Sequence, residues 1–284
     1  MPTDRPGRPG ARHKPPARRE PPRREATRGE PPRPSGDLIY GRNAVLEALR
    51  GRRQLRRLLL AEGIKEDERI RRLIQAAESA SLPIARVSRA DLDRRTAHAN
   101  HQGVALEAGP YPYVDLADLL TAPGTVLILD HLQDPQNFGT LLRAAEATGV
   151  AGVIIPRDRA VDVTPAVVNA SAGAVEHLAI AQVPNLARAI ESLKEAGWWA
   201  AALDTGPDAQ NLFTTDLPSP LAIVVGAEGT GVSPGVRRHC DLVLEIPMVG
   251  KVTSLNAATA GAIALFDLMR RELQSSNPDR TSSE

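Results

Sequence analysis

The residues best suited to chemistry in this 284-residue chain fall in three short segments of its C-terminal part. The first runs from Asp134 to Arg143 (DPQNFGTLLR), the second from Gly226 to Gly231 (GAEGTG) and the third from Ile246 to Asn256 (IPMVGKVTSLN). Each lies where a predicted strand gives way to a loop and then a helix. Together they supply glycine-lined backbone, a helix N-terminus that favours anions, and five polar side chains of catalytic type: Asn137, Arg143, Glu228, Ser254 and Asn256.

The first segment also has an ordinary structural interpretation. Asp134 is a good N-cap, Pro135 suits the first helical position, and Gly149 can end the helix. Asn137 then lies in the first turn and Arg143 about two turns further on. Taken alone, this segment predicts a capped helix with a surface arginine.

The second and third segments are equally ambiguous when taken singly. Three glycines in Gly226–Gly231 let the backbone approach a ligand, but the pattern is neither the dinucleotide-binding GxGxxG nor the phosphate-binding GxxxxGK[ST]. Glu228 adds a carboxylate at the carboxyl end of a strand, where α/β sheets place ligand chemistry. Thr253 or Ser254 is predicted to cap the last helix, a role compatible with chemistry at Ser254.

The elements that must position these segments are predicted by periodicity. Apolar runs, typical of a parallel sheet covered on both faces, predict strands at 125–129, 152–155, 178–183, 198–203, 221–225 and 242–246. Helices are expected at 135–148, 165–176, 186–196 and 255–273. In the last helix, apolar residues at three- and four-residue multiples predict one buried stripe: Leu255, Ala262, Phe266, Met269 and Leu273.

A smaller α/β unit precedes this sheet, with strands expected at 55–61, 83–87 and 103–107 and helices at 43–49, 67–80 and 89–96. Residues 1–36 have ten prolines, no Val, Ile, Leu or aromatic residue, and ten basic against four acidic residues, a net of +6. This composition predicts a disordered basic extension, either a phosphate-binding arm or a solubilising tail. The expected organisation is an extension at 1–36, a small domain at 37–108, a linker at 109–120, a larger domain at 121–274 and a tail at 275–284.

Composition narrows the class of protein. Cys240 is the single cysteine, which excludes an internal disulfide, and no spacing of ligands predicts a metal site. The N-terminus does not resemble a secretory signal and no apolar run spans a bilayer, so we expect a cytoplasmic protein without a membrane partner. His131 follows Asp130 and invites an acid–base role, but a hydrogen-bonding role is the commoner one for such a loop histidine.

In this order, the three segments resemble the signature motifs of the SpoU/TrmH family of SPOUT RNA 2′-O-ribose methyltransferases. The stretch from Ile39 to Leu49 (IYGRNAVLEAL) resembles the start of that family's L30e-like substrate-binding domain. The resemblance covers about residues 38–273. It is closest to the RlmB subgroup, which methylates a guanosine ribose in the peptidyl-transferase region of 23S large-subunit rRNA.

The resemblance implies an α/β fold with two domains. The C-terminal one is expected to be a trefoil-knotted SPOUT methyltransferase domain with a mostly parallel sheet, and the N-terminal one a smaller L30e-like domain. It implies a homodimer formed through the knotted domain, with the final helix involved. It also implies the cofactor S-adenosylmethionine, held largely by main-chain groups at Gly226, Ala227, Ile246, Met248 and Leu255.

The implied reaction is an in-line attack of a ribose 2′-hydroxyl on a sulfonium methyl group, with Asn137, Arg143, Glu228, Ser254 and Asn256 as the catalytic set. Arg143 is expected to meet the hydroxyl and the adjacent phosphate, and Glu228 to orient Arg143. A guanidinium is hard to deprotonate, so the group that takes the hydroxyl proton stays open. For RNA binding the candidates are Arg42, Asn43, Arg53 and Arg56, with Arg52 and Arg57 in the same cluster, although a solvated charged surface explains this cluster equally well.

Three alternatives remain at this point. The substrate is tRNA or another rRNA site, or the chain is a noncatalytic knotted RNA-binding or ribosome-assembly factor, or it is a generic nucleotide-binding α/β protein. The N-terminal domain favours an rRNA enzyme, since TrmH-type tRNA enzymes lack it. The presence of Arg143, Glu228 and Asn256 argues against a noncatalytic factor, and the absence of a standard phosphate loop argues against the last alternative. The target nucleotide, and whether naked rRNA or an assembling subunit is modified, cannot be read from the sequence.

Overall fold

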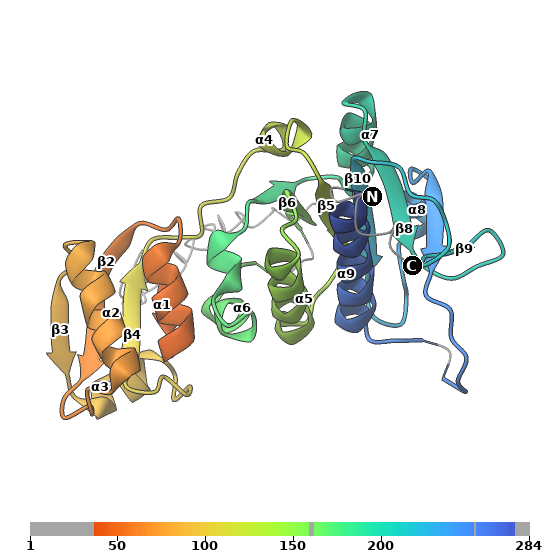
Figure 1. Ribbon diagram of the computed structural model, residues 1–284. Coiled ribbons are helices and arrows are strands. Elements are labelled where there is room, and N and C mark those ends of the chain that lie inside the picture. The colour runs from red at the N-terminus through yellow and green to blue at the C-terminus, as the bar shows by residue number, and fades with distance from the viewer. Residues whose placement is uncertain (1–36, 159–161, 253, 276–284) are drawn as a thin grey trace, which may run out of the picture. The chain divides into compact units, whose positions relative to one another are not determined.

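The computed structural model of the protein describes residues 37–158, 162–252 and 254–275, which belong to one compact unit with two sheets (Figure 1). The extension predicted at 1–36 and most of the tail predicted at 275–284 lie outside the described residues. Within the described part of the chain, no helix is long and apolar enough to cross a membrane.

The first sheet is the smaller one and has the strand order β1-β4-β2-β3. Its strands are β1 (Asp37–Tyr40), β2 (Leu55–Ala61), β3 (Ile84–Val87) and β4 (Val104–Ala108). Its helices are α1 (Arg42–Arg50), α2 (Glu68–Ser79) and α3 (Arg89–Arg95). β4 pairs antiparallel with β1 and β2, whereas β2 and β3 are parallel. The three predicted strands are thus confirmed, and β1 adds a fourth, because Asp37–Tyr40 pairs along β4 rather than leading loosely into α1.

The second sheet has seven strands in the order β7-β6-β5-β10-β8-β11-β9, and every pairing in it is parallel. Its strands are β5 (Thr125–Asp130), β6 (Gly152–Pro156), β7 (Ile180–Val183), β8 (Trp199–Leu203), β9 (Gln210–Asn211), β10 (Leu221–Gly226) and β11 (Leu242–Glu245). The predicted α/β class with a mostly parallel sheet is therefore confirmed. The two-residue β9 was not predicted, since it carries no apolar run.

Helices cover both faces of this sheet. They are α4 (Leu116–Leu120), α5 (Pro135–Ala147), α6 (Pro165–Ala170), the 3₁₀ helix η1 (Ala174–His177), α7 (Leu186–Glu195), α8 (Pro234–Arg237) and α9 (Ala257–Ser275). Successive strand residues alternate between two cores: Leu127 and Ile223 pack with α5 and α9, whereas Ile128 and Val224 pack with α4, α7 and α8. α4 lies inside the segment expected to be a plain linker. Helices cover both faces of the strands, so neither face of the sheet is open to a ligand. The site must therefore lie at an edge where strands end.

The helix predicted at 165–176 is interrupted. After α6, Ala172 (φ 54°) and Gly173 (φ 91°) adopt left-handed backbone conformations that an α-helix cannot continue through. A Cβ atom on Gly173 would lie 2.6 Å from the Cβ of Glu47 on α1. The turn therefore makes room for α1, a tertiary requirement that periodicity does not reveal.

The buried stripe predicted on the last helix is wrong. Phe266 and Leu273 are 47% and 62% exposed, and the buried face is instead formed by Ala257, Ala258, Gly261, Ala264, Leu265, Asp267 and Leu268. A Cβ atom on Gly261 would lie 2.7 Å from Cδ1 of Leu141, so small residues are needed where α9 meets α5. α9 thus has a small-residue face toward the core and a second apolar face toward the outside.

Candidate active site

The N-terminus of α5 positions Asn137 at the carboxyl edge of the large sheet. The carboxylate of Asp134 accepts hydrogen bonds from the backbone N–H groups of Gln136 (3.3 Å) and Asn137 (3.0 Å), and Pro135 occupies the first turn. Gly149 follows the helix with φ 68°. The predicted capping is confirmed, and it fixes the direction in which the Asn137 side chain leaves the helix.

The glycine loop, defined as Gly226–Gly231, continues from β10 at the same edge. A Cβ atom on Gly226 would lie 2.0 Å from the carbonyl carbon of Gly231, so only glycine fits where the loop folds back on itself. Gly229 and Gly231 have φ values of 81° and 66°, and the Gly231 N–H donates to the carbonyl of Ala227 at 3.0 Å. The glycines are therefore required by a tight turn that leaves main-chain groups facing outward from the strand end.

The third segment is capped by Asn256 and not by the residues that the sequence suggested. Oδ1 of Asn256 accepts hydrogen bonds from the N–H groups of Ala258 (2.9 Å) and Thr259 (3.2 Å) at the start of α9. Thr253 lies outside the described residues, and Ser254 precedes the helix by three residues. The hydroxyl of Ser254 is therefore not used as the N-cap of α9.

Three of the predicted catalytic residues meet in one hydrogen-bonded cluster. The amide of Asn137 donates to Oε2 of Glu228 at 3.0 Å, and the amide of Asn256 donates to Oδ1 of Asn137 at 2.9 Å and to Oε2 of Glu228 at 3.3 Å. These residues are separated by up to 119 positions in the chain. Among the described residues, Oε1 of Glu228 accepts no hydrogen bond, so the cluster presents one oxygen of a fixed carboxylate.

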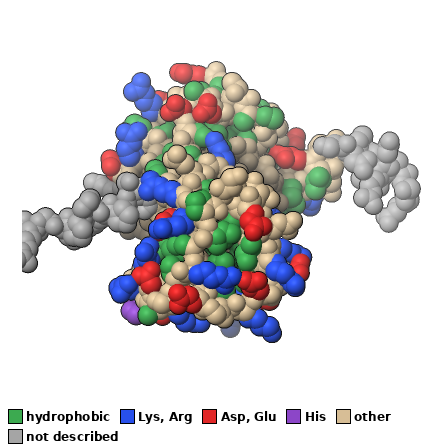
Figure 2. All heavy atoms as spheres, turned by 90° about the vertical axis from the view of Figure 1, so that its left-hand side faces the viewer, with side chains coloured by type: hydrophobic (Ala, Val, Ile, Leu, Met, Phe, Trp, Pro, Cys, Tyr) green, Lys and Arg blue, Asp and Glu red, His purple; other side chains and the backbone are tan. Residues whose placement is uncertain are grey.

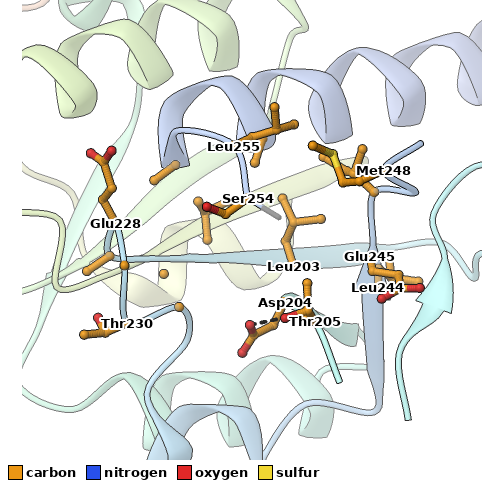
Figure 3. A pocket seen from close by; sticks show the side chains of 18 residues that line it. Leu203, Asp204, Thr205, Glu228, Thr230, Leu244, Glu245, Met248, Ser254 and Leu255 are labelled. Carbon is orange, nitrogen blue, oxygen red and sulfur yellow. Dashed lines mark hydrogen bonds between the residues drawn. The ribbon is translucent and has the colours of Figure 1, made fainter. Parts of the chain in front are cut away.

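A cavity of about 350 Å³ lies beside this cluster. The glycine loop and Glu228 form one side, Ser254 and Leu255 approach from the start of α9, and Asp204 and Thr205 close it from the end of β8 (Figure 3). All five residues predicted to bind a cofactor line the cavity: Gly226, Ala227, Ile246, Met248 and Leu255. Its walls thus combine main-chain polar groups with apolar side chains.

Among the described residues, Arg143 is the one predicted catalytic residue that neither belongs to this cluster nor lines the cavity. It follows Asn137 by six residues along α5, a rise of about 9 Å. Its side chain is exposed and, within the described residues, makes no hydrogen bond or ion pair. The predicted orientation of Arg143 by Glu228 is therefore absent from the described contacts.

Several cavity residues were not predicted. They lie at the carboxyl ends of β8 and β11 or on the glycine loop: Leu203, Asp204, Thr205, Gly229, Thr230, Gly231, Leu244 and Glu245. Ligands of parallel α/β sheets bind outside the carboxyl ends of strands, and this rule, applied to 198–203 and 242–246, would have indicated the residues that follow those strands. The carboxylate of Asp204 accepts from the N–H of Thr205 at 2.9 Å and pairs with Arg237 at 3.0 Å.

The expected RNA-binding residues divide into surface and buried groups. Asn43 and Arg56 are exposed, and Arg42 is half-buried with its guanidinium 2.5 Å from the carboxylate of Asp67. Of the neighbours in the same cluster, Arg52 is exposed, and Arg57 forms a two-pronged ion pair with Glu107. The four-stranded-sheet side of the molecule shows basic and acidic side chains mixed around a hydrophobic area (Figure 2).

Arg53 requires a correction. Its side chain is fully buried, with Nε 2.9 Å from both carboxylate oxygens of Glu176 and Nη1 bonded to Asp37. Burial raises the pKa of Glu176, although the Arg53 charge opposes this shift. A guanidinium held in this way joins α1 and its neighbours to η1 and cannot reach an RNA backbone, so we remove Arg53 from the RNA-binding set.

Comparison with known proteins gives matches to the same kind of protein for the N-terminal and the C-terminal part of the chain. Residues 124–266 match the SpoU rRNA Methylase family, and residues 38–114 match the domain described as RNA 2′-O ribose methyltransferase substrate binding. The putative TrmH family tRNA/rRNA methyltransferase YacO of Bacillus subtilis is 39% identical over 241 residues, which cover 83% of this chain and 96% of YacO. The uncharacterized tRNA/rRNA methyltransferase slr0955 of Synechocystis is 40% identical over 242 residues, but the chain spans only 62% of its length.

A solved structure has the same fold. The SpoU methyltransferase AviRb of Streptomyces viridochromogenes, in complex with the cofactor AdoMet, superimposes with a TM-score of 0.71 at 24% identity. The match covers 84% of this chain and 91% of AviRb. At this sequence identity the structural similarity supports the fold alone.

Proposed function

This chain belongs to the SpoU/TrmH family of RNA methyltransferases, and we propose that it transfers a methyl group from S-adenosylmethionine to a ribose 2′-hydroxyl of RNA. The observation that carries this proposal is the cluster of Asn137, Glu228 and Asn256 beside the glycine-lined cavity. A carboxylate held by two amides next to a ligand cavity is suited to orienting a hydroxyl group. Among the alternatives, a noncatalytic RNA-binding factor would not need this arrangement.

The residues around the cavity fit the proposed cofactor. A volume of about 350 Å³ lies within the range of small-molecule sites, and the walls offer main-chain groups together with the apolar side chains of Leu203, Ile246 and Leu255. Gly226, Ala227, Ile246, Met248 and Leu255 would hold it. When bound, the cofactor supplies an electrophilic methyl group on a sulfonium cation, and the carboxylate of Glu228 offers a complementary negative charge.

The chain's own side chains supply positioning. Asn137 and Asn256 hold Oε2 of Glu228, and Oε1 is left to accept a hydrogen bond from the ribose hydroxyl. Ser254 lines the cavity and can contact the same ribose. Arg143, exposed on α5, would bind the adjacent phosphate and stabilise developing negative charge. Orientation of two reactants in such a site is worth about 7–11 kcal/mol of the barrier.

For the substrate we propose a guanosine of 23S large-subunit rRNA, as in the RlmB subgroup. The match of residues 38–114 to a substrate-binding domain supports RNA binding by the N-terminal part of the chain. The proposed contacts there are Arg42, Asn43 and Arg56. The names of the relatives include both tRNA and rRNA, so tRNA is the alternative substrate. The 2′-hydroxyl, which only RNA carries, limits the substrate to RNA in either case.

We also propose a trefoil-knotted large domain and a homodimer that buries the outer apolar face of α9. Phe266 and Leu273 are large and exposed on that face. Full burial of such a side chain is worth about 1.5–3 kcal/mol, and because these two are already partly buried, a second copy of the same helix would add roughly half of that for each.

The test is transfer of a labelled methyl group from S-adenosylmethionine to 23S rRNA that lacks its ribose methyl groups, with the modified nucleotide mapped. Methylation at one guanosine 2′-oxygen would support both the proposed reaction and the proposed rRNA substrate. Methylation of tRNA alone would support the reaction but replace rRNA by tRNA as the substrate. Arg143→Ala should abolish turnover and preserve S-adenosylmethionine affinity. Arg188→Ala, an exposed arginine on α7 at the opposite face of the sheet, is the matched control and should retain both.

A further inference from the structure

Asp130 is a buried carboxylate to which the proposed reaction assigns no role. It ends β5, in register with Gly226 of the adjacent β10, and only 1% of its surface is exposed. Oδ2 accepts a hydrogen bond from the backbone N–H of Ser233 at 2.7 Å, and Oδ1 lies 2.5 Å from Nδ1 of His131. Because a buried charge is costly unless it is bonded, these two contacts determine whether a carboxylate can remain at this position.

The contact with Ser233 secures the far end of the glycine loop. Ser233 follows Gly231 by two residues and is the N-cap of α8. The near end of the loop is fixed by β10, but the loop itself has three glycines and little side-chain packing to define its shape. Two hydrogen bonds close it, from Gly231 to Ala227 and from Ser233 to Asp130, and the buried side chain of Val232 lies between them in the chain.

His131 in turn holds the carboxylate. Its backbone is left-handed (φ 59°), an unusual conformation for a residue with a side chain, and this turns the imidazole back onto Asp130. Because an ionised carboxylate can only accept, the tautomer that fits this contact carries its proton on Nδ1 and donates to Oδ1, which leaves Oδ2 for the N–H of Ser233. The pair therefore acts as a two-part clamp between the end of β5 and the start of α8.

We propose that Asp130, oriented by His131, is a positioning residue that keeps the glycine loop closed in the shape that binds the cofactor. This inference rests on the proposed use of S-adenosylmethionine but adds a residue that does not contact it. A loop that is already closed loses less conformational freedom on binding, so its affinity is higher. Without the carboxylate, the cofactor would have to close the loop itself.

The chain offers a control in Asp241, which makes the same two kinds of bond but is exposed. Its carboxylate also accepts from a backbone N–H, that of Ala200 at 3.0 Å, and also pairs with a basic side chain, Lys194 at 2.5 Å. It does not line the cofactor cavity. Loss of Asp241 therefore removes the same kinds of bond without touching the glycine loop.

The experiment compares S-adenosylmethionine affinity by calorimetry in wild type, Asp130→Ala and Asp241→Ala. Asp130→Ala should raise Kd about tenfold, the effect of one charge-assisted hydrogen bond, and Asp241→Ala should leave it unchanged. Asp130→Asn should restore most of the affinity, because its amide oxygen accepts from Ser233 and its NH₂ donates to the other tautomer of His131. Unchanged affinity in Asp130→Ala, or an equal loss in Asp241→Ala, would overturn the inference.

Two further measurements keep the test independent of folding and of the proposed function. Ser233→Pro deletes the N–H donor at a residue whose φ of −58° suits proline, leaves Asp130 in place, and should raise Kd by a similar factor. Hydrogen exchange of the Gly229–Val232 amides, measured without cofactor, should be faster in Asp130→Ala than in Asp241→Ala. If wild type binds no S-adenosylmethionine, the proposed function fails, whereas the exchange comparison still decides whether Asp130 clamps the loop.

Discussion

Asn256 has two roles that substitution can separate. Its Oδ1 caps α9 by accepting from Ala258 and Thr259, and its amide Nδ2 holds Asn137 and Glu228. Asn256→Ser keeps a capping oxygen but has no amide. Asn256→Asp keeps the cap, loses the amide and adds a negative charge beside Glu228, and Asn256→Ala loses both roles.

The expected magnitudes follow from these contacts. Loss of an N-cap costs about 1 kcal/mol, which for a domain of this size lowers Tm by roughly 2–4 °C, so Asn256→Ala should melt that far below Asn256→Ser. The two amide bonds contribute about 0.5–1.5 kcal/mol each to the orientation of Glu228. If that orientation operates in the transition state, Asn256→Ser should lower kcat roughly tenfold to a hundredfold. In Asn256→Asp, a second carboxylate about 4 Å from Glu228 adds a repulsion of about 1 kcal/mol in water-like surroundings, which lowers kcat further.

The assay is kcat for methyl transfer between pH 5.5 and 8, together with Tm for each variant. Only Asn256→Asp should regain activity as the pH falls, because a proton shared between the two carboxyl groups restores a hydrogen-bond donor at the lost amide position. Wild-type kcat in Asn256→Ser would show that the cluster does not act in the reaction. A pH profile for Asn256→Asp that parallels that of Asn256→Ser would refute the contact with Glu228.

Three other outcomes are expected. Partial burial raises the pKa of the Cys240 thiol to about 12, so at pH 8 it should react with a disulfide reagent much more slowly in the native protein than in urea. Equal reaction rates in the two states would contradict the raised pKa. Phe266→Asp combined with Leu273→Asp should convert the proposed dimer to a monomer in sedimentation with unchanged helix content, and a wild type that is already monomeric would exclude the dimer. Arg53→Met leaves Glu176 buried without its partner and should cost about 3–5 kcal/mol in denaturant unfolding at pH 7. That cost should shrink as the pH falls, because a protonated Glu176 needs no counter-charge, and a pH-independent cost would contradict this reason.

The sheet could be predicted from the sequence because its signal is local. Each central strand is an apolar run buried on both faces, and the position of α5 follows from Asp134 and Pro135, which act within one turn. The cavity residues at the end of β10 could be predicted for the same reason, since a parallel sheet aligns its strand ends. Local patterns were therefore sufficient for the central strands and for the edge at which they meet, but not for β1, β9, α4 or the break between α6 and η1.

Other features depended on contacts that a pattern does not contain. Both faces of α9 are apolar, so periodicity detected Phe266 and Leu273 but could not decide which face meets the core; the need for Gly261 against Leu141 decides it. Arg53 has the same sequence signal as its exposed neighbours, and only Glu176, 123 residues away, makes it internal. In each case the deciding partner lies on a distant segment.

In this fold, the motif residues that cap helices also position the proposed catalytic groups. Their structural role and their catalytic role therefore cannot be assigned to different residues. Three helices begin near the strand ends that carry the site, and a polar side chain acts at each start: Asp134 caps α5, Asp130 binds the N–H of Ser233, which is the N-cap of α8, and Asn256 caps α9. These bonds direct Asn137, the glycine loop and the end of the third segment toward one another. A cap in this position is therefore part of the site, and an alanine substitution there measures folding and chemistry together. Only variants that keep the cap, such as Asn256→Ser, can measure the chemistry alone.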